Sequence, residues 1–441
     1  MAIAAENLAA MTPQLIGVSG LVLLVVLIFL RVPVAAALMI VGLAGYWAID
    51  GARTALFTLG EVPFNIAQAY SLSVVPLFLL MGVVAARTKM ASELYVAANT
   101  LFSGMRGGIA MGTVGACAGF GAICGSSLAT ASTMTRVSIP EMRKYGYSDA
   151  IASGVVASGG TLGILIPPSI ILIIYAIIAQ ESVPVLFAAA ILPGLLLTLL
   201  HIVTLGILAR TRPQDIPAGT PPSAGWRALL SLWKLVLLFG VVIGGIFGGI
   251  FSPTEAAAVG AALAIVIGLT TRQLSLCGLI DSFAETVRTT GSLFLIVLGA
   301  FMFAAFMVQS RIPASLGGWI VSQELSPLAI ILFLIVIYLI LGCFLDSISM
   351  ILITVPVFLP IVEAVGYSPV WFGIFLVIVA EIGLITPPVG LNIFVIRGQA
   401  PDIPLGQIYR GIVPFLGAQL AGVALLIALP GLALWLPGWL Y

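Results

Sequence analysis

The sequence predicts an all-α polytopic membrane protein with an inverted-topology repeat, made of about ten spanning helices plus two re-entrant hairpins. Three observations predict this fold. The 441 residues are 61% hydrophobic and only 7% charged, whereas a soluble domain carries about a quarter charged residues. Apolar runs approach or reach the roughly 17–25 residues that cross a hydrocarbon core. Residues that constrain the backbone in the first half also recur at a constant offset in the second half.

The apolar runs account for the spanning helices. Representative runs are Leu15–Leu30, Val185–Leu208, Leu235–Phe251 and Ile412–Leu436. The first run follows a segment, Met1–Gln14, that contains Glu6 but no lysine or arginine. Because a cleavable signal peptide begins with a cationic region, we expect the first run to be a retained helix.

The lysines and arginines predict the orientation. When the apolar runs are followed in order with the N-terminus outside, all of the 17 cations except Arg53 and Arg311 fall on the inner face. This distribution follows the positive-inside rule, and the reverse orientation puts nearly every cation on the wrong face. We therefore expect both termini on the outer side of the membrane.

One segment of the first half fits neither one crossing nor two. The residues between Arg106 and Arg136 are mostly glycine, alanine and small polar residues, and both flanking cations lie on the predicted inner face. Two half-helices of about 14 residues, rising about 1.5 Å per residue, reach roughly to the membrane midplane. We interpret residues 107–138 as a re-entrant hairpin with its turn at Gly121–Ser127.

The second half repeats this plan. Adding 220 to Pro33 gives Pro253, and adding 220 to Gly146 gives Gly366. The offset predicts a first repeat over 1–212, a connector over 213–227, and a second repeat over 228–441 with its own hairpin at 327–358. Five crossings and one hairpin per repeat invert the second copy. Inverted repeats with discontinuous helices are typical of secondary carriers, and an old duplication without functional symmetry is the alternative.

Each repeat also contains two consecutive prolines inside an apolar run, Pro167-Pro168 and Pro387-Pro388. Proline removes a backbone donor and pushes the preceding residue out of the helical region, so we expect broken helices over 149–178 and 370–396. Free carbonyls at membrane depth need a partner, and a sodium ion, which takes several oxygen ligands, is a natural one. A proline kink satisfied by a neighbouring serine or threonine is the alternative interpretation.

The hairpin tips supply polar groups for a substrate site. Ser126 and Ser127 lie in the first tip, and Asp346 and Ser347 lie in the second. Helices that begin at these turns present free N–H groups and the positive end of the helix dipole, which suit a carboxylate ligand. Asn392 is a further candidate for this cavity, or alternatively forms a hydrogen bond between helices.

Two acids fall inside the predicted membrane region, Asp346 and Glu381. An acidic side chain is costly at that depth and indicates function. Contact with sodium, uptake of a proton, and hydrogen bonds that hold a tip closed are the three roles that we expect for them.

Other classes of function are excluded or disfavoured. The formal charge of +1 excludes a strongly basic nucleic-acid binder. The sequence contains no GxSxG nucleophile, no HExxH metal helix and no P-loop lysine, so we expect neither an enzyme nor an ATP-driven pump, and no organic cofactor. An open channel is disfavoured, because a channel needs no broken hairpins at symmetric depth.

Several longer strings are specific to one family. Residues Gly121–Ser169 contain GAICGSSLATASTM, SIPEM, GYS and GGTLGILIPPS. PTEAAAVGA occupies Pro253–Ala261, and GLITPPVGLNIFVIRG occupies Gly383–Gly398. With these strings, the chain resembles over almost its whole length the large membrane (DctM-like) subunit of tripartite ATP-independent periplasmic (TRAP) transporters.

The resemblance implies a sodium-coupled importer of a small organic anion, usually a carboxylate, in the bacterial cytoplasmic (inner) membrane. It also implies two partners, a small four-helix membrane subunit and a periplasmic substrate-binding protein, and an elevator mechanism of carrier movement. No four-helix segment is fused to this sequence, so the small subunit is expected as a separate chain. A stand-alone ion-coupled anion symporter or exchanger of similar fold is the alternative.

Two sodium (Na⁺) sites are further implied by the resemblance. The first involves the first hairpin tip together with Gly163, Ile166 and Pro168. The second involves Gly342, Gly383, Thr386 and Val389. Val389 is expected to contribute only its carbonyl, so its side chain is not diagnostic.

Overall fold

The computed structural model describes residues 12–217, 225, 227–323 and 326–441, and within these ranges the chain forms helices and turns without any strand. The helices of the first half are α2 (Pro13–Phe29), α3 (Val34–Gln68), the short η1 (Tyr70–Ser73), α4 (Val74–Arg87), α5 (Met90–Leu101), α6 (Gly108–Cys124), α7 (Ser127–Lys144), α8 (Asp149–Leu165), α9 (Ile170–Ala179) and α10 (Val183–Thr211). Those of the second half are α11 (Arg227–Leu230), α12 (Trp233–Phe247), α13 (Pro253–Thr270), α14 (Leu276–Gln309), α15 (Ile312–Ser322), α16 (Pro327–Gly342), α17 (Ser347–Ala364), α18 (Pro369–Gly383), α19 (Leu391–Gln399), α20 (Leu405–Ala428) and α21 (Gly431–Leu440). Most of the N-terminal segment 1–14 and much of the connector 213–227 lie outside the described residues.

Helix bounds in the two halves keep the offset of 220. α7 and α17 coincide at both ends, since 127 + 220 = 347 and 144 + 220 = 364. Gly146 and Gly366 follow these helices with φ of 82° and 89°, a conformation that glycine adopts without strain and that ends helices. Both helices therefore continue past residues 138 and 358, where the sequence predicted the hairpins to end.

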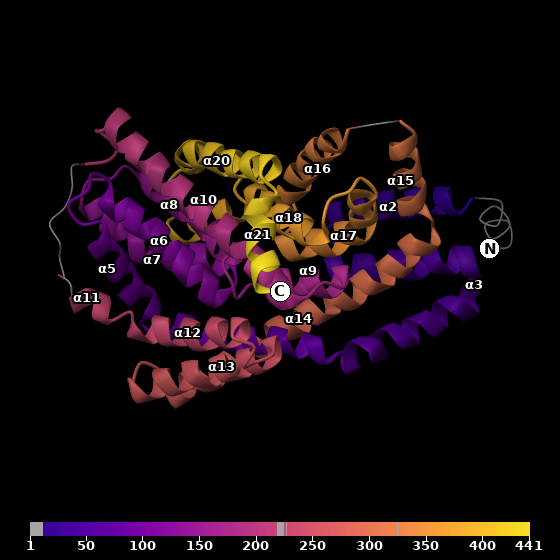
Figure 1. Ribbon diagram of the computed structural model, residues 1–441, viewed down its shortest axis with the longest axis horizontal. Helices are drawn as coiled ribbons and strands as arrows, with labels where there is room; N and C mark the ends of the chain where they lie inside the picture. The colour runs from indigo at the N-terminus through magenta and orange to yellow at the C-terminus, as the bar shows by residue number, and fades with distance from the viewer. Residues whose placement is uncertain (1–11, 218–224, 226, 324–325) are drawn as a thin grey trace.

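The longest helices differ between the halves. α3 contains a kink at Gly51, with φ 83° and ψ 168°, and the corresponding position of the second half is the break between α13 and α14. Conversely, α14 is continuous over 34 residues. The corresponding residues of the first half, 56–89, are interrupted by η1. α3 packs along α14 (Figure 1), and α4 packs against α13. We call α3, α4, α13 and α14 the framework helices, because their contacts join the two halves reciprocally.

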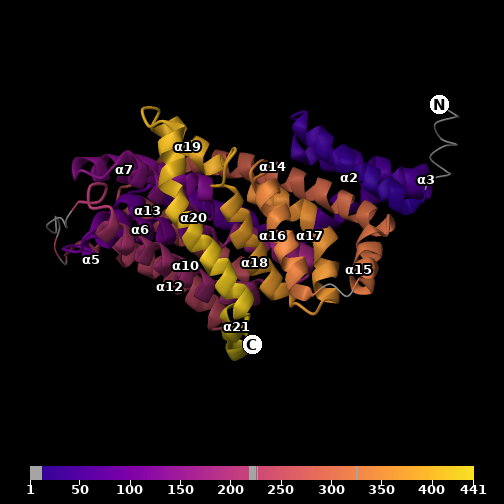
Figure 2. The same ribbon diagram turned by 90° about the horizontal axis from the view of Figure 1, so that it is seen from above.

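Eight other helices, four in each half, form a second group around the two hairpins. The α6–α7 hairpin packs on α8, and the α16–α17 hairpin packs on α18. Contacts across the halves link α8 to α20 and α10 to α18. Figure 2 shows α17 beside α14, and the two helices pack against each other. We call α6–α9 and α16–α19 the hairpin group.

The described part of the chain contains eight helices that are long and apolar enough to cross a membrane, or nine when the bent pair α8–α9 is counted as one span. The sequence predicted about ten. The nine include α17, an arm of the second hairpin, and leave out α2 and α18, which have 17 and 15 residues and are short when each is taken alone. The all-α membrane fold is confirmed, and the chain is a multi-pass membrane protein.

An ion-pair cluster ties the end of the first hairpin to the second half. Arg143, in the last turn of α7, contacts Asp149 at 2.6 Å and Asp402 at 2.5 Å. Asp402 lies in the loop between α19 and α20, where the hydrogen bond from the Arg143 guanidinium holds the pKa of its carboxyl below the ordinary value. The cluster links α7, α8 and the α19–α20 loop at one end of the molecule.

Candidate substrate and sodium site

A cavity of about 130 Å³ lies where both hairpin tips, both broken helices and the framework helices meet. Its polar side chains come mainly from the tips, namely Ser126, Ser127, Asp346 and Ser347. The rest of the lining is Leu79 of α4, Thr289 and Leu293 of α14, and Gly125, Leu128, Ile164, Ile170, Ile171, Ile348 and Leu384. None of these lining residues is a lysine or an arginine. The polar groups that this cavity offers a ligand are therefore N–H groups, hydroxyls and the carboxyl group of Asp346.

Each tip is the beginning of a helix whose cap is a polar side chain. Ser126 caps α7 by accepting a hydrogen bond from the N–H of Ala129 at 3.3 Å. At the equivalent position, 126 + 220 = 346, Asp346 accepts hydrogen bonds from the N–H (3.1 Å) and the hydroxyl (2.5 Å) of Ser349. The caps leave other first-turn N–H groups without helical partners. The positive ends of two helix dipoles thus meet at one cavity.

Glu381 of α18 lies against both tips. The hydroxyl of Ser347 donates a hydrogen bond to its Oε1 at 2.7 Å, and the hydroxyl of Ser127 interacts with the same carboxyl group. Ser127 and Ser347 are equivalent residues, since 127 + 220 = 347. Glu381 is only 3% exposed, and its Oε2 has no hydrogen-bond partner in the described part of the chain. One buried carboxyl group therefore connects the same residue of both repeats.

The position equivalent to Glu381 in the first repeat is Thr161. Its hydroxyl donates to the carbonyl of Ser158 at 2.6 Å and accepts from the amide of Gln419 at 2.6 Å. These contacts stay between α8 and α20. The link between the tips is thus a property of the second repeat alone.

The first helix break leaves its carbonyls free. α8 ends at Leu165 and α9 begins at Ile170, with a bend of 45° between them. Across the described residues, no protein group donates a hydrogen bond to the carbonyls of Ile166, Pro167 or Pro168. Ile166 is half-buried and both prolines are buried. Buried free carbonyls at the negative end of a helix are suitable ligands for a cation.

The second helix break has the same sequence pattern but different partners. The hydroxyl of Tyr409 donates to the carbonyls of Pro388 (2.8 Å) and Val389 (3.1 Å). The thiol of Cys343 lies 3.3 Å from the carbonyl oxygen of Pro387 and 3.6 Å from that of Thr386, and its nearest acceptor is the carbonyl of Leu339 at 3.1 Å. The hydroxyl of Thr386 donates to the carbonyl of Ile382 at 2.6 Å. Pro387 and Pro388 are exposed. The carbonyls of Pro388 and Val389 therefore share a hydroxyl donor, and a thiol lies near the carbonyls of Thr386 and Pro387.

A pair of glycines brings hairpin and broken helix together in each repeat. A Cβ on Gly163 would lie 2.2 Å from the Cα of Gly121, and a Cβ on Gly383 would lie 2.5 Å from the Cα of Gly342. Only glycine fits at such a distance between two backbones. The predicted sodium residues Gly163, Gly342 and Gly383 therefore stand at close backbone contacts beside the breaks.

Asn392 lies outside this cavity. It is fully buried in α19, and its Nδ2 donates to the carbonyl of Ala157 in α8 at 3.4 Å. This contact corresponds to the alternative interpretation, a hydrogen bond between helices. Its Oδ1 has no partner in the described part of the chain.

Sequence reasoning missed Tyr409 and Cys343, and also the framework residues of the cavity. The offset of 220 gave no signal for them, because the equivalents of Tyr409 and Cys343 are Ala189 and Ile123. Thr289, beside Thr290, is the one lining residue of α14 that its polarity marks within a largely apolar helix.

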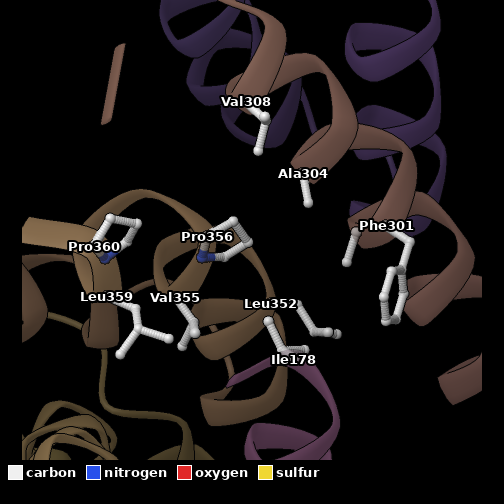
Figure 3. A pocket seen from close by; sticks show the side chains of 10 residues that line it. Ile178, Phe301, Ala304, Val308, Leu352, Val355, Pro356, Leu359 and Pro360 are labelled. Atoms are coloured by element: carbon white, nitrogen blue, oxygen red, sulfur yellow. The ribbon is translucent and has the colours of Figure 1, made fainter. Parts of the chain in front are cut away.

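A larger cavity, of about 220 Å³, lies between α14 and α17 near the end of α9 (Figure 3). All of its lining side chains are apolar. An anion would lose its hydration there without gaining a hydrogen bond. This larger cavity is therefore excluded as the anion site.

A bundle of membrane helices that encloses a small polar cavity between two hairpin tips, with a broken helix on each side, defines a membrane transport protein. Its helices are interrupted at the polar groups, as in carriers that bind solutes at the membrane midplane. The chain belongs to the family described as tripartite ATP-independent periplasmic transporter, DctM component, whose model matches residues 21–432.

Known relatives agree with this family. The C4-dicarboxylate TRAP transporter large permease protein of Pseudomonas aeruginosa is 37% identical over 86% of this chain and 88% of its own length. The ectoine/5-hydroxyectoine TRAP transporter large permease protein of Ruegeria pomeroyi is 33% identical over 94% of this chain and 96% of its own. The crystal structure of the Alcanivorax borkumensis YdaH transporter shares the fold, with a TM-score of 0.65 at 15% identity over 88% of this chain and 90% of its own.

Proposed function

We propose that this chain imports a small organic anion, of the carboxylate class, by coupling its movement to sodium. Relatives are named for C4-dicarboxylate and for ectoine, which supports import of small solutes but leaves the individual solute open. The family description as a periplasmic tripartite transporter supports delivery by a periplasmic binding protein. The name "large permease protein" supports a small four-helix partner subunit.

The observation that carries this proposal is the composition of the 130 Å³ cavity. Two helix N-termini, three serine hydroxyls and the capping carboxyl group of Asp346 face it, while lysine and arginine are missing from its lining. Sodium at the free carbonyls of Ile166–Pro168 supplies positive charge beside the helix dipoles. An anion then binds better when the cation is present, which is the basis of symport.

The proposed movement is of the elevator type. The hairpin group carries the tips and the breaks, and the framework helices contribute Leu79, Thr289 and Leu293 to the cavity wall. Two cavities separate α14 from the hairpin group, so packing between the groups is incomplete along this helix. Incomplete packing lowers the cost of sliding one group past the other.

The membrane and orientation follow from the same proposal. A periplasmic binding protein supports a place in the bacterial inner membrane, and the positive-inside distribution of the cations supports a periplasmic position of both termini. In this orientation the α6–α7 hairpin opens toward the cytoplasm and the α16–α17 hairpin toward the periplasm, as two inverted repeats.

Thermal unfolding of the purified chain with its small subunit tests sodium binding. Midpoints are compared in sodium, potassium and choline chloride at equal ionic strength. Sodium that binds only the folded state stabilises by about 2.7 kcal/mol at a hundredfold excess over Kd. We expect a sodium-specific rise that Ser127→Ala and Thr386→Ala both reduce.

Thr198→Ala is the matched control, because its hydroxyl also donates to a carbonyl one turn back, Gly194 at 2.8 Å, but in α10. Identical curves in the three salts would contradict sodium binding in the absence of substrate. Uptake into proteoliposomes with and without the binding protein then separates this proposal from the stand-alone symporter.

A further inference from the structure

Two helices lead away from the 130 Å³ cavity toward the same side of the membrane. α7 contributes Ser127 and Leu128 from its first turn, and α14 contributes Thr289 and Leu293 from its middle. In the proposed orientation, the end of α7 and the beginning of α14 both lie at the cytoplasmic face. The main packing partners of α7 are α5, α6, α8 and α19, and those of α14 are α2, α3, α4, α15 and α17. The two helices therefore share the cavity without packing closely on one another.

One face of α7 is polar and accessible. Ser132 and Thr133 are half-buried and Arg136 is exposed, and at about 100° per residue these three positions fall within roughly 100° of the helix circumference. The hydroxyls of Ser132 and Thr133 have no hydrogen-bond partner among the described residues. The buried hydroxyls of Thr130 and Thr135, by contrast, donate to carbonyls one turn back, at 2.8 Å and 2.6 Å.

The N-terminal half of α14 shows the same distinction. On its buried face, Ser282 and Thr286 donate to carbonyls one turn back, at 2.7 Å and 2.8 Å. On its apolar face, Val287 is 69% exposed. An exposed polar face lies between these two and consists of Asp281, Glu285, Arg288, Thr289 and Ser292. The hydroxyls of Thr289 and Ser292 have no partner within the part of the chain that the structure describes.

The free hydroxyls indicate what these two faces meet. A hydroxyl group at membrane depth needs a hydrogen-bond partner, and acyl chains offer none. Hydroxyls on the buried faces bond to their own helix, whereas those on the polar faces leave that bond unmade and so require water. An arginine is likewise costly against hydrocarbon. The polar faces of α7 and α14 therefore border water rather than lipid.

The acids beside these faces already have partners. Asp281 and Glu285 of α14 both contact Arg87, at the end of α4, at 3.6 Å and 2.7 Å. Glu141, near the end of α7, contacts Lys144 at 3.5 Å. The negative charges near the two polar faces are thus offset by cations of the same chain.

Arg136 and Arg288 remain available to a ligand. No salt bridge within the described residues involves either of them. Arg288 directly precedes Thr289, which lines the cavity, and Arg136 lies eight residues beyond the lining residue Leu128, a rise of about 12 Å. A guanidinium group binds a carboxylate through two parallel hydrogen bonds. The two faces therefore offer an organic anion positive groups that the cavity wall itself lacks.

The second repeat lacks both arginines at the equivalent positions. The equivalent of Arg288 is Gln68, since 288 − 220 = 68, and the equivalent of Arg136 is Pro356, since 136 + 220 = 356. Pro356 lines the apolar 220 Å³ cavity across which α17 faces α14 (Figure 3). The helix face that is polar in α7 is thus apolar in α17 and packs toward the framework.

We propose that the 130 Å³ cavity opens to the cytoplasm through water between α7 and α14, and that Arg136 and Arg288 are an anion-binding exit on this route. The ligand is the carboxylate group of the transported solute, which passes the two guanidinium groups after it leaves the cavity. This inference rests on the proposed function. Because α14 belongs to the fixed framework, Arg288 meets the anion only when the moving cavity is on the cytoplasmic side.

Thiol labelling tests the route, on the chain with its small subunit in membrane vesicles of known orientation. Cys277, the exposed cysteine, is first replaced by serine. Ser132→Cys and Ser292→Cys are then treated with membrane-impermeant methanethiosulfonates that carry a sulfonate or a trimethylammonium group. We expect both cysteines to react from the cytoplasmic face. Val287→Cys is the control, because that position is more than two-thirds exposed but lies on the apolar face and should stay unlabelled.

The charge preference of labelling tests the two arginines. Each rate is divided by the rate of the same reagent with free cysteine in solution. The sulfonate reagent should be favoured about three- to tenfold, and less in about 1 M salt, where the Debye length falls to about 3 Å. Arg136→Gln should reduce the preference at Ser132→Cys. Arg288→Gln should reduce it at Ser292→Cys. Arg210→Gln is the control, since Arg210 is an exposed cation of α10, a helix of neither wall.

Three outcomes would overturn the proposal. Absence of labelling at both cysteines from the cytoplasmic face excludes the water route. Equal labelling of Val287→Cys shows that exposure alone, not water, decides the result. A charge preference that is absent, or that neither Arg136→Gln nor Arg288→Gln changes, excludes the anion-binding exit. The two cysteines lie on different helices, so one wall is still tested if a variant of the other does not fold. None of these readouts uses transport or sodium, so failure of the proposed sodium coupling would be seen separately.

Discussion

The two helix breaks have the same sequence pattern and opposite surroundings. In the first, the carbonyls of Ile166–Pro168 are largely buried and receive no hydrogen bond from described residues. In the second, Tyr409 donates to the carbonyls of Pro388 and Val389, the thiol of Cys343 lies near those of Thr386 and Pro387, and the prolines are exposed. Both proline pairs nevertheless contain a cis peptide bond.

This difference shows that the same proline pattern at two helix breaks does not give their carbonyls the same hydrogen-bond partners. The break fixes where carbonyls lose their helical partners, because proline supplies no donor. What then satisfies those carbonyls depends on residues that reach the break from other helices. In the first repeat that place is open to a cation, whereas in the second a hydroxyl and a thiol already occupy it.

The largest effect is expected from closing the glycine contact in either repeat. Gly163→Ala would place a Cβ 2.2 Å from the Cα of Gly121, and Gly383→Ala would place one 2.5 Å from the Cα of Gly342. Overpacking against a side chain costs about 1–3 kcal/mol, and backbone gives way less readily. We expect loss of folded protein in size-exclusion chromatography for both variants, with Gly163→Ala the more severe.

Gly417→Ala is the control, because no atom lies within 4 Å of its added Cβ. If one repeat tolerates alanine as well as position 417 does, the two contacts are not equivalent, and the close packing of that hairpin is not needed for folding.

The next effect concerns the carboxyl group that joins the tips. Glu381→Ala removes the acceptor of Ser347 and leaves buried hydroxyls unsatisfied, at a cost of about 1–3 kcal/mol. We expect a lower thermal midpoint, loss of the sodium-specific rise, and loss of uptake. Glu381→Gln keeps an acceptor, so it should retain more of the thermal stability, of the sodium-specific rise and of uptake than Glu381→Ala does.

Thr161→Ala is the matching change in the first repeat. It breaks the contact with Gln419 and should lower the midpoint while leaving the sodium-specific rise in place. Equal loss of that rise in both variants would show that Glu381 and Thr161 contribute equally to sodium binding, and would contradict a role of Glu381 alone.

A smaller and opposite effect is expected at Tyr409. Tyr409→Phe frees the carbonyls of Pro388 and Val389, so sodium no longer competes with a hydroxyl for them. We expect slightly lower stability without sodium and an apparent sodium affinity higher by about 2–10-fold. Tyr175→Phe serves as the control, since its hydroxyl donates to the carbonyl of Pro369 at 2.6 Å, away from the break. An unchanged sodium titration for Tyr409→Phe would mean that the second break does not bind sodium.

The smallest effect is expected at the Arg143 cluster. The guanidinium lowers the pKa of Asp402 in the folded protein, so the stabilisation is complete above the unfolded pKa and is lost as pH falls through the lowered folded pKa. Asp402→Asn should lower the thermal midpoint slightly at neutral pH, and the difference from the unchanged protein should shrink on acidification or in high salt. A difference that grows in acid would contradict this role.

The sequence predicted the positions that local chemistry determines. Consecutive prolines marked both breaks, and the serine or aspartate at 126 and 346 marked the start of the helices that leave the tips. The four tip residues indeed line one cavity. These features depend on residues close together in the chain, which a single sequence records directly.

Residues that meet only through packing were not predictable in this way. Tyr409 reaches the second break from α20, and Thr289 reaches the cavity from α14. Asn392 follows the second break closely in sequence, yet it points to Ala157 of the other repeat. Such contacts depend on how helices from different repeats are placed, and neither spacing nor an internal offset contains that information.

The lining of the 130 Å³ cavity also determines how the carrier responds to voltage. Asp346 lines it and Glu381 lies beside its tip serines, while basic side chains are missing from its walls. In the elevator mechanism proposed above, the carboxylate of Asp346 travels with the cavity. Each uncompensated charge that crosses a membrane potential changes the free energy by about 2.3 kcal/mol per 100 mV. Bound sodium and the bound anion both change this charge on the loaded step, so the empty return, with the Asp346 carboxylate uncompensated, is expected to depend on the membrane potential.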